Sequence, residues 1–248
     1  MKSPFLLCAA LGATLPAAAA VVVSSGALNL AIPDDGGPGL VHTLQVNTPG
    51  AVAAVAVSLQ VTPLGGGAWT GDLYAYLRHD TGLAVLLNRS GRSATQPFGY
   101  GDGQPLALTL SDDAANGDLH SYRLTLTGDE ATALTAPLTG SWQPSGRPTD
   151  PAVVGAGDAR TAMLGSFTGL DVAGGWSLFV ADLVEGGQFR LDSWGVEITP
   201  VTPVPEPALA AVGGAAGLLA WAAGRRRRNG RIVSAALNGS SLNRSEPK

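Results

Sequence analysis

Between residues 21 and 200, apolar side chains recur at every second position, and this period of two restricts what the chain can fold into. The runs are bounded by Gly, Pro, Asp and Asn, which are the residues that form turns. Because alternate side chains of a strand point to opposite faces, each run indicates a strand with one buried face. The buried sets that we expect are Leu28/Leu30/Ile32, Val55/Val57/Leu59/Val61, Leu73/Ala75/Leu77, Leu83/Val85/Leu87, Leu106/Leu108/Leu110, Tyr122/Leu124/Leu126 and Trp176/Leu178/Val180.

The last run, FRLDSWGVEI, changes phase between Leu191 and Trp194. One extra residue at Asp192-Ser193 would absorb that change, so the sequence predicts a β-bulge there. No segment of residues 21–200 keeps a helical period over three turns. Eight or more half-buried strands without helices predict an all-β fold, an antiparallel β-sandwich or jelly roll.

The N-terminus is typical of a secretory signal peptide, which we assign to residues 1–20. Lys2 precedes an apolar stretch from Phe5 to Leu15, and a run of alanines then offers cleavage sites for signal peptidase near Ala18 to Ala20. The alternative is a buried first strand or helix. Cys8 is the one cysteine and lies inside this signal, so the mature protein is expected to contain no disulfide.

The C-terminal part has the composition of a membrane segment followed by a basic tail. Residues 208–224 contain no charge, and a helix of this length spans about 26 Å, the lower limit for crossing a bilayer. Arg225, Arg226, Arg227 and Arg228 follow, and such positive charge stays on the cytoplasmic side. The alternative, a buried soluble helix, would require four adjacent guanidinium groups to be solvated at its end. We expect residues 225–248 to be disordered in the cytoplasm.

Charge is distributed unevenly along the chain. Residues 21–200 hold 14 Asp and 3 Glu against 7 Arg, a net charge near −10, whereas residues 208–248 are near +6. Nucleic acid binding requires clustered Lys and Arg on the folded body, so the acidic body argues against nucleic acid as a partner. The basic cluster next to an apolar run indicates a membrane instead.

The segment from residue 200 to the arginines carries a family resemblance. Pro205, Glu206 and Pro207, then the apolar segment and the arginine cluster, resemble the PEP-CTERM sorting signal of certain Gram-negative bacteria. The resemblance implies a precursor held in the inner membrane with its body in the periplasm, cleavage near the motif by an exosortase, and delivery to the envelope or extracellular matrix. Many such bacteria secrete polysaccharide, which is an expected further partner. The twenty residues after the arginines depart from the usual pattern.

Residues 26–199 resemble the P domain (P/Homo B) of proprotein convertases, a β jelly roll. The matching motifs, in order, are Gly71-Asp72-Leu73, Gly175-Trp176-Ser177-Leu178, Asp182, Gly186-Gly187 and Trp194. In convertases this domain follows a subtilisin-like catalytic domain. No such domain is present in this sequence, so the resemblance implies no protease activity.

Residue chemistry favours a non-catalytic protein. The three histidines, His42, His79 and His120, are expected on the surface, and no G-x-S-x-G elbow accompanies them. No His or Cys spacing suits zinc. Paired carboxylates for sugar hydrolysis are not excluded, because their separation depends on the fold. A secreted hydrolase with such a pair is therefore an alternative function.

No cofactor is required, but two acidic turns are calcium candidates, because calcium prefers oxygen ligands. The candidate ligands are Asp34, Asp35, Asp112, Asp113, Asn116 and Asp118. The second turn is not an EF-hand, since Ala114 and Arg123 occupy ligand positions of that motif. The competing interpretation is that these residues simply form turns.

Aromatic residues near two Gly- and Pro-rich stretches are candidates for stacking on sugar rings. They are Trp69, Tyr74, Tyr76 and Trp142, and the stretches, residues 62–71 and 136–161, are expected to be loops. The alternative is that these rings cover sheet edges or pack in the core. The sequence therefore predicts an exported structural or adhesive module, with a calcium-dependent carbohydrate-binding module as another alternative.

Overall fold

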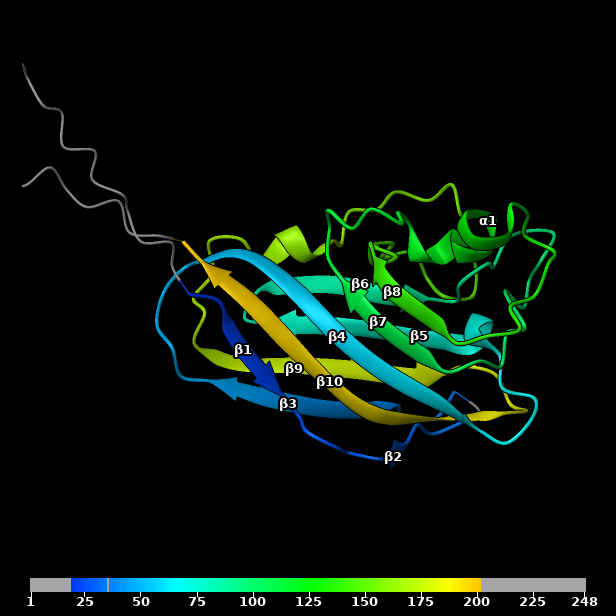
Figure 1. Cartoon of the computed structure of the whole chain (residues 1–248), viewed down its shortest axis with the longest axis horizontal. Helices are drawn as coiled ribbons and strands as arrows, with labels where there is room; N and C mark the ends of the chain where they lie inside the picture. The colour runs from blue at the N-terminus through cyan, green and yellow to red at the C-terminus, as the bar shows by residue number, and fades with distance from the viewer. Residues whose placement is uncertain (1–18, 35, 202–248) are drawn as a thin grey trace, which may run out of the picture. The chain divides into compact units, whose positions relative to one another are not determined.

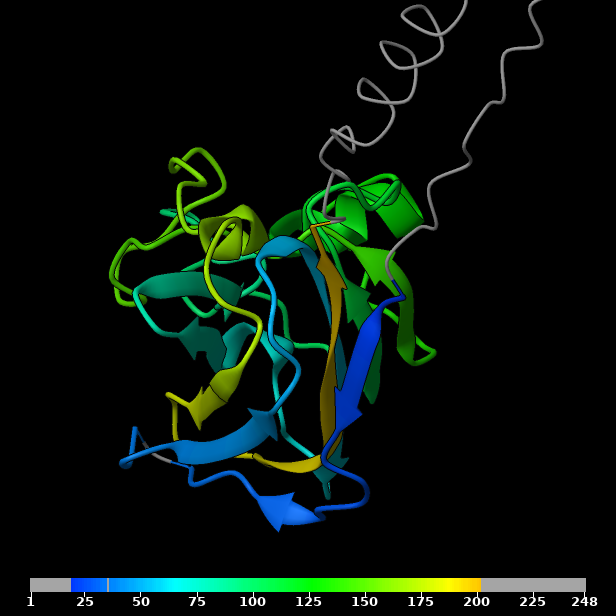
Figure 2. The same ribbon diagram turned by 90° about the vertical axis from the view of Figure 1, so that its left-hand side faces the viewer.

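Two β-sheets packed face to face make up the folded body, in a computed structural model that describes residues 19–34 and 36–201. Figure 2 shows β1, β4 and β10 of one sheet and β3 of the other from a second direction. The strand order is β1-β10-β4-β7-β8 in one sheet, with β2 also paired to β10, and β3-β9-β5-β6 in the other. This arrangement confirms the predicted β-sandwich (Figure 1).

The elements are short, apart from the two long strands β4 and β10. The strands are β1 (Val21–Ser24), β2 (Leu30–Ala31), β3 (Leu40–Val46), β4 (Val52–Leu64), β5 (Leu73–His79), β6 (Gly82–Asn88), β7 (Leu106–Leu110), β8 (Leu138–Trp142), β9 (Gly174–Asp182) and β10 (Gln188–Pro200). The helices are the 3-10 turns η1 (Thr70–Asp72), η2 (Leu119–Ser121) and η3 (Leu164–Phe167), and the α-helix α1 (Tyr122–Thr127).

The predicted alternation is confirmed in the central strands. In β4 every second residue from Val55 to Val61 is buried, and in β9 the buried set is Trp176, Leu178 and Val180. The predicted bulge is also confirmed. In β10, Leu191 pairs with Val61 but Ser193 already pairs with Gln60, so Asp192 is the extra residue.

The sandwich is mixed rather than purely antiparallel, which corrects the prediction. Strands β7 and β8 run parallel, with Leu106 beside Leu138 and Leu110 beside Trp142. Parallel neighbours need a long crossover connection. Here residues 111–137, which contain η2 and α1, return the chain to the end of the sheet where β7 begins. Strand β8 itself lies inside residues 136–161, so that stretch is not all loop.

One predicted strand is a helix. Tyr122, Leu124 and Leu126 belong to α1, where positions two apart do not share a face, so Tyr122 is buried while the two leucines are about half exposed. The helix ends at Gly128, whose N–H donates to the Leu124 carbonyl and whose φ of +85° turns the following chain out of the helix. Six residues are too few for a helical period to appear in the sequence.

Two other predicted strand faces are only partly correct. In β6, Leu83 is exposed, whereas Val85, Leu86 and Leu87 are all buried. The pairing of β6 with β5 shifts register between Ala75 and Tyr76, so Leu86 is an extra residue and the alternation is interrupted. Residues 145–162 run along the other edge of β6, where the Ser145 N–H donates to the Leu86 carbonyl. Near the N-terminus Leu30 is exposed and only Ile32 reaches the core, since β2 is two residues long.

Candidate functional site

Three loops meet at the end of the sandwich where β4 and β9 end and β5 and β10 begin, on the right in Figure 1. They are residues 65–72, 98–103 and 183–187. Glycines allow their backbones to touch: a Cβ on Gly71 would overlap the Phe98 carbonyl, and one on Gly187 would overlap the backbone of Ala68. The sequence thus needs glycine at both positions for the loops to pack.

An open cleft of about 300 Å³ lies among these loops. Its walls are two aromatic rings, Trp69 and Phe98, which are 40% and 57% exposed and meet edge to face with centroids 6.3 Å apart. The Trp69 ring rests on Gly101, where a Cβ would come within 3.2 Å of it. The remaining lining residues are Gly67, Asp72, Val184, Glu185 and Gly186. The cleft therefore combines exposed rings with two carboxyl side chains.

Asp72 lies in the wall of the cleft and is almost completely buried. Arg89 faces it, with Nη2 3.5 Å from Oδ1, while the Arg89 Nε donates to the Gly71 carbonyl at 2.9 Å. Burial raises the pKa of Asp72 to about 6, although the charge of Arg89 acts against the rise. Asp72 thus has one weak ion pair as compensation for its burial.

Asp182 lies next to Asp72 in space. It ends β9 beside Leu73 of β5, and the Leu183 N–H donates to the Asp72 carbonyl at 3.0 Å. Its side chain is fully buried, and neither carboxylate oxygen accepts a hydrogen bond of normal geometry. Burial raises its pKa to about 7, and the charges of Asp72 and Asp34 add to the rise, whereas the Val184 N–H acts against it.

A polar network supports the cleft from behind. Asp102 binds Arg123 through two contacts, Nε to Oδ2 at 2.7 Å and Nη2 to Oδ1 at 2.8 Å. Tyr122 donates its hydroxyl to the same carboxylate, and Thr70, next to Trp69, donates to the Asp102 backbone carbonyl. Both ends of the ion pair are buried, so the network ties the 98–103 loop to η1 and α1.

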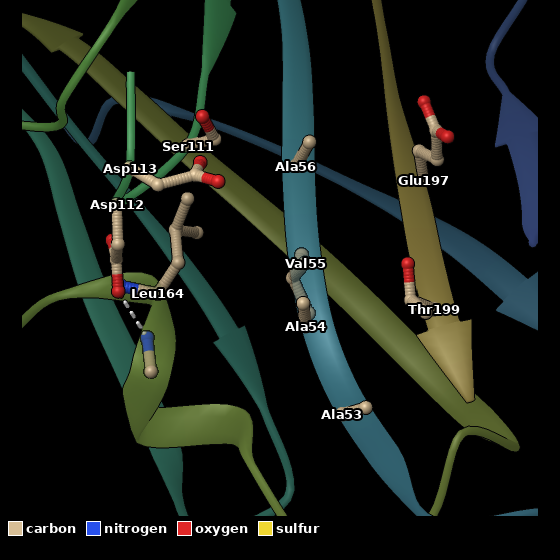
Figure 3. A pocket seen from close by; sticks show the side chains of 11 residues that line it. Ala53, Ala54, Val55, Ala56, Ser111, Asp112, Asp113, Leu164, Glu197 and Thr199 are labelled. Carbon is tan, nitrogen blue, oxygen red and sulfur yellow. Dashed lines mark hydrogen bonds between the residues drawn. The ribbon is translucent and has the colours of Figure 1, made fainter. Parts of the chain in front are cut away.

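A second, larger hollow of about 520 Å³ lies on the six-stranded sheet. Figure 3 shows Glu197 and Thr199 of β10 on one side of β4, and Asp112, Asp113 and Leu164 on the other. Alanines of β4 line it, and no aromatic ring does. Because this hollow has no aromatic ring on which a ligand could stack, the end cleft is the better binding candidate.

The calcium candidates of the second acidic turn make separate contacts. Asp112 accepts the Leu164 and Gly165 N–H groups at 3.0 and 2.7 Å, so it caps η3. Asp118 caps η2 at the His120 N–H and binds Arg147, with Nη2 to Oδ2 at 2.6 Å. Asp113 lines the hollow of Figure 3, and Asn116 is exposed. In residues 19–34 and 36–201, no three acidic, histidine or cysteine side chains converge as a metal cluster.

The first acidic turn lies elsewhere, near the end cleft. Asp34 accepts the Gly186 N–H at 3.4 Å, and Asp35 is outside the described residues. Sequence reasoning did not select Asp72 and Asp182 as site residues, although a signal existed. Asp182 is in phase with Trp176, Leu178 and Val180, so the period of two already placed a carboxylate on the buried face.

Among the aromatic candidates, only Trp69 meets the prediction of an open ring. Tyr74 and Tyr76 are half-buried, and Tyr76 stacks on Phe179 at 4.8 Å. Trp142 is completely buried, which corrects the expectation. Its Nε1 donates to the Thr139 carbonyl at 3.0 Å, so its polar edge needs no water.

The histidines are not all on the surface either. His79 is buried between the Gly175 and Asp171 carbonyls and stacks on Trp176. His120 is buried between the Asn88 and Arg92 carbonyls, and burial lowers its pKa. These contacts show that both rings help to hold the fold.

The predicted sorting residues, Pro205, Glu206, Pro207 and Arg225 to Arg228, lie outside the described residues, as do residues 1–18 of the expected signal peptide. Within residues 19–34 and 36–201, no helix has the length and apolar character needed to cross a membrane. The predicted spanning segment 208–224 is not among them.

Comparison with known proteins gives distant structural matches alone, since no family model and no curated protein matches the chain. A serine protease of Aeromonas sobria aligns with a TM-score of 0.41 and 17% identity over 77% of this chain. The Aeromonas sobria serine protease in complex with its chaperone aligns with a TM-score of 0.40 and 18% identity over 75% of this chain. The alignment spans 28% of the length of each of those chains.

Proposed function

We propose that this chain is an exported protein of the envelope or extracellular matrix, sorted through a PEP-CTERM signal, whose sandwich is an adhesive module of P-domain type. The order of three features supports the sorting: Pro205-Glu206-Pro207, the apolar segment 208–224, and the arginines from Arg225. The order of the glycine, aspartate and tryptophan motifs in residues 26–199 supports the domain type.

The observation that carries the adhesive role is the pair of exposed rings in the end cleft. Trp69 and Phe98 present apolar faces beside the carboxyl groups of Asp72 and Glu185. Sugars have apolar ring faces and hydroxyl donors, so the rings would stack on the former and the exposed Glu185 carboxylate would accept from the latter. We therefore assign the cleft to carbohydrate, as expected for a protein of a polysaccharide matrix.

The same geometry argues against hydrolysis by the neighbouring carboxylates. A glycosidase needs two carboxyl groups that flank the scissile bond and contact the sugar. Asp182 has no exposed surface, so it does not reach a ligand bound in the cleft. Asp72 is almost completely buried and faces Arg89, which leaves Glu185 as the exposed carboxylate among the lining residues. We therefore propose a non-catalytic protein.

Carbohydrate binding is tested by affinity electrophoresis of the full-length chain in detergent, in gels containing dextran, xylan or alginate. We expect one of these polysaccharides to slow the wild type. Trp69→Ala and Phe98→Ala should each lose most of that retardation, because truncating an aromatic residue that anchors a ligand costs about 2 kcal/mol or more. Leu126→Ala, a change at a similarly exposed apolar residue on α1, is the control. Equal retardation of Trp69→Ala and the control would contradict the proposed site.

Sorting is tested separately, in a host that contains an exosortase. Replacing Pro205, Glu206 and Pro207 with alanine should leave membrane insertion intact, because the apolar segment and arginines are unchanged. Alanine lets a helix continue where proline keeps the chain extended, which would hide the cleavage site. The variant should therefore remain full length, while the wild type becomes shorter by about 40 residues. Equal processing of both chains would refute the sorting proposal.

A further inference from the structure

The carboxylate of Asp182 has little compensation for its burial, a weak contact with the Val184 N–H. It is fully buried, and neither of its oxygens accepts a hydrogen bond of normal geometry. A buried ionised carboxylate is strongly unfavourable unless a cation or hydrogen-bond donors surround it. In a well-packed structure, a bound ion is one way to stabilise such a group.

The neighbouring charges do not supply that compensation. Asp72 is a second buried carboxylate, and its Oδ1 also lacks a hydrogen-bond partner. Arg89 faces Asp72, with its Nη2 3.5 Å from that atom, and its Nε is already bound to the Gly71 carbonyl. This ion pair belongs to Asp72, so it does not offset the burial of the Asp182 carboxylate.

A third carboxylate approaches from the loop between β2 and β3. Asp34 accepts the Gly186 N–H, and the Gly36 N–H donates to the Asp182 backbone carbonyl at 3.0 Å. The charge of Asp34 acts on both buried carboxylates. Three carboxylates and one guanidinium leave a local charge of about −2, which equals the charge that a divalent cation would neutralise.

We propose that Asp72 and Asp182, together with Asp34, bind one calcium ion at the end of the sandwich. All three donors are carboxylate oxygens, the hard ligands that calcium prefers, and calcium accepts six to eight oxygens in flexible geometry. In the part of the chain that the structure describes, three acidic side chains do not yet converge on one point. Binding therefore draws Asp34 toward the buried pair, and water completes the coordination.

The site has a direct connection to the cleft. Asp72 lines the cleft and is one of the proposed calcium ligands. Gly186 also lines the cleft, and its N–H donates to Asp34, another proposed calcium ligand. Calcium would therefore order the loop 183–187 that forms one wall. The proposal does not depend on what the cleft binds, so it stands or falls independently of the carbohydrate experiment.

The test is calcium titration of the full-length chain in detergent at pH 8, after removal of metals with a chelator. Extracellular calcium modules bind with a Kd of about 10⁻⁴–10⁻³ M. At calcium tenfold above Kd, the melting temperature of a domain of this size should rise by about 3–6 °C. Isothermal titration calorimetry should give one ion per chain.

Three variants distinguish calcium binding at this site from binding elsewhere on the acidic surface. Asp182→Asn should abolish the calcium-dependent rise, and in chelator it should melt above the wild type because a buried charge is gone. Asp34→Asn, at a residue that is not buried, should keep the fold and weaken calcium binding about tenfold or more. Asp113→Asn, an acidic residue of the other candidate turn, should respond to calcium as the wild type does.

Specific results would overturn the proposal. The first is that calcium up to about 10 mM, well above the Kd range of such modules, does not raise the melting temperature of the wild type. The second is that calcium raises the melting temperature of Asp34→Asn or Asp182→Asn as much as that of the wild type. The third is that Asp113→Asn loses the calcium response to the same extent as those two variants. If the pair holds only a shared proton, the melting temperature will depend on pH and not on calcium, which also overturns it.

Discussion

Replacing Asp102 with asparagine should destabilise the protein by about 3–5 kcal/mol, because it leaves a buried guanidinium without its counter-charge. The Arg123 and Asp102 side chains are 6% and 2% exposed, and the ion pair has two short contacts of 2.7 and 2.8 Å. Asparagine has nearly the same shape, but its amide nitrogen would face Arg123 with a second donor. The loss is therefore electrostatic and not a loss of packing.

Urea denaturation followed by tryptophan fluorescence measures this change, since Trp142, Trp176 and Trp194 are buried. The expected loss corresponds to a fall in melting temperature of about 6–20 °C for a domain of this size. A double variant, Asp102→Asn with Arg123→Met, should recover part of the loss, because the unpaired charge is then removed.

The matched control is Asp192→Asn, which breaks a pair of the same kind with Arg190 at 2.6 Å. In that pair Arg190 is 36% exposed and Asp192 is 20% exposed, so its loss should cost about 1 kcal/mol or less. A loss of less than about 1 kcal/mol in Asp102→Asn, or equal losses in both variants, would refute the argument that burial makes the first pair important.

The remaining predictions concern a buried histidine, a packed glycine and a buried tryptophan. Burial lowers the pKa of His120 in the folded state, so stability should fall as pH drops below about 6.5, where the unfolded chain gains a proton. His120→Gln should reduce this dependence of stability on pH, measured by denaturation at pH of about 5 to 8. Gly71→Ala should cost about 1–3 kcal/mol, because the new Cβ meets backbone, whereas Gly66→Ala, with open space around it, should be close to neutral in the same assay. Trp142→Ala should cost about 3–5 kcal/mol, and Leu126→Ala, half exposed on α1, less than about 1 kcal/mol by urea denaturation.

Sequence patterns predicted the buried residues well in strands that bury one face. The alternation from Val55 to Val61 and in β9 matches the structure, and the bulge at Asp192 follows from a change of phase that any pairing of β10 must absorb. Where a strand contains an extra residue that the pattern did not predict, as β6 does at Leu86, the alternation is interrupted and the prediction was only partly correct.

The site was less accessible to sequence reasoning than the fold. Trp69 was predicted to be exposed, and it is 40% exposed. Phe98 and Arg89 were not selected, since nothing in their own surroundings marks them. Phe98 lines the cleft because loops far apart in sequence meet at one end of the sandwich, and Arg89 lies there because it contacts Asp72.

The sequence by itself determined the mainly β character and the bulge in β10, because each depends on backbone conformation and side-chain alternation over a few residues. Only the tertiary structure decided that β7 and β8 run parallel, that α1 replaces a strand, and that Asp72 and Asp182 lie together. Those outcomes depend on which distant segments pair and on how much water they exclude. An aspartate in a solvated turn has no unfavourable burial energy. Its charge becomes strongly unfavourable when two strands bury it beside a second carboxylate.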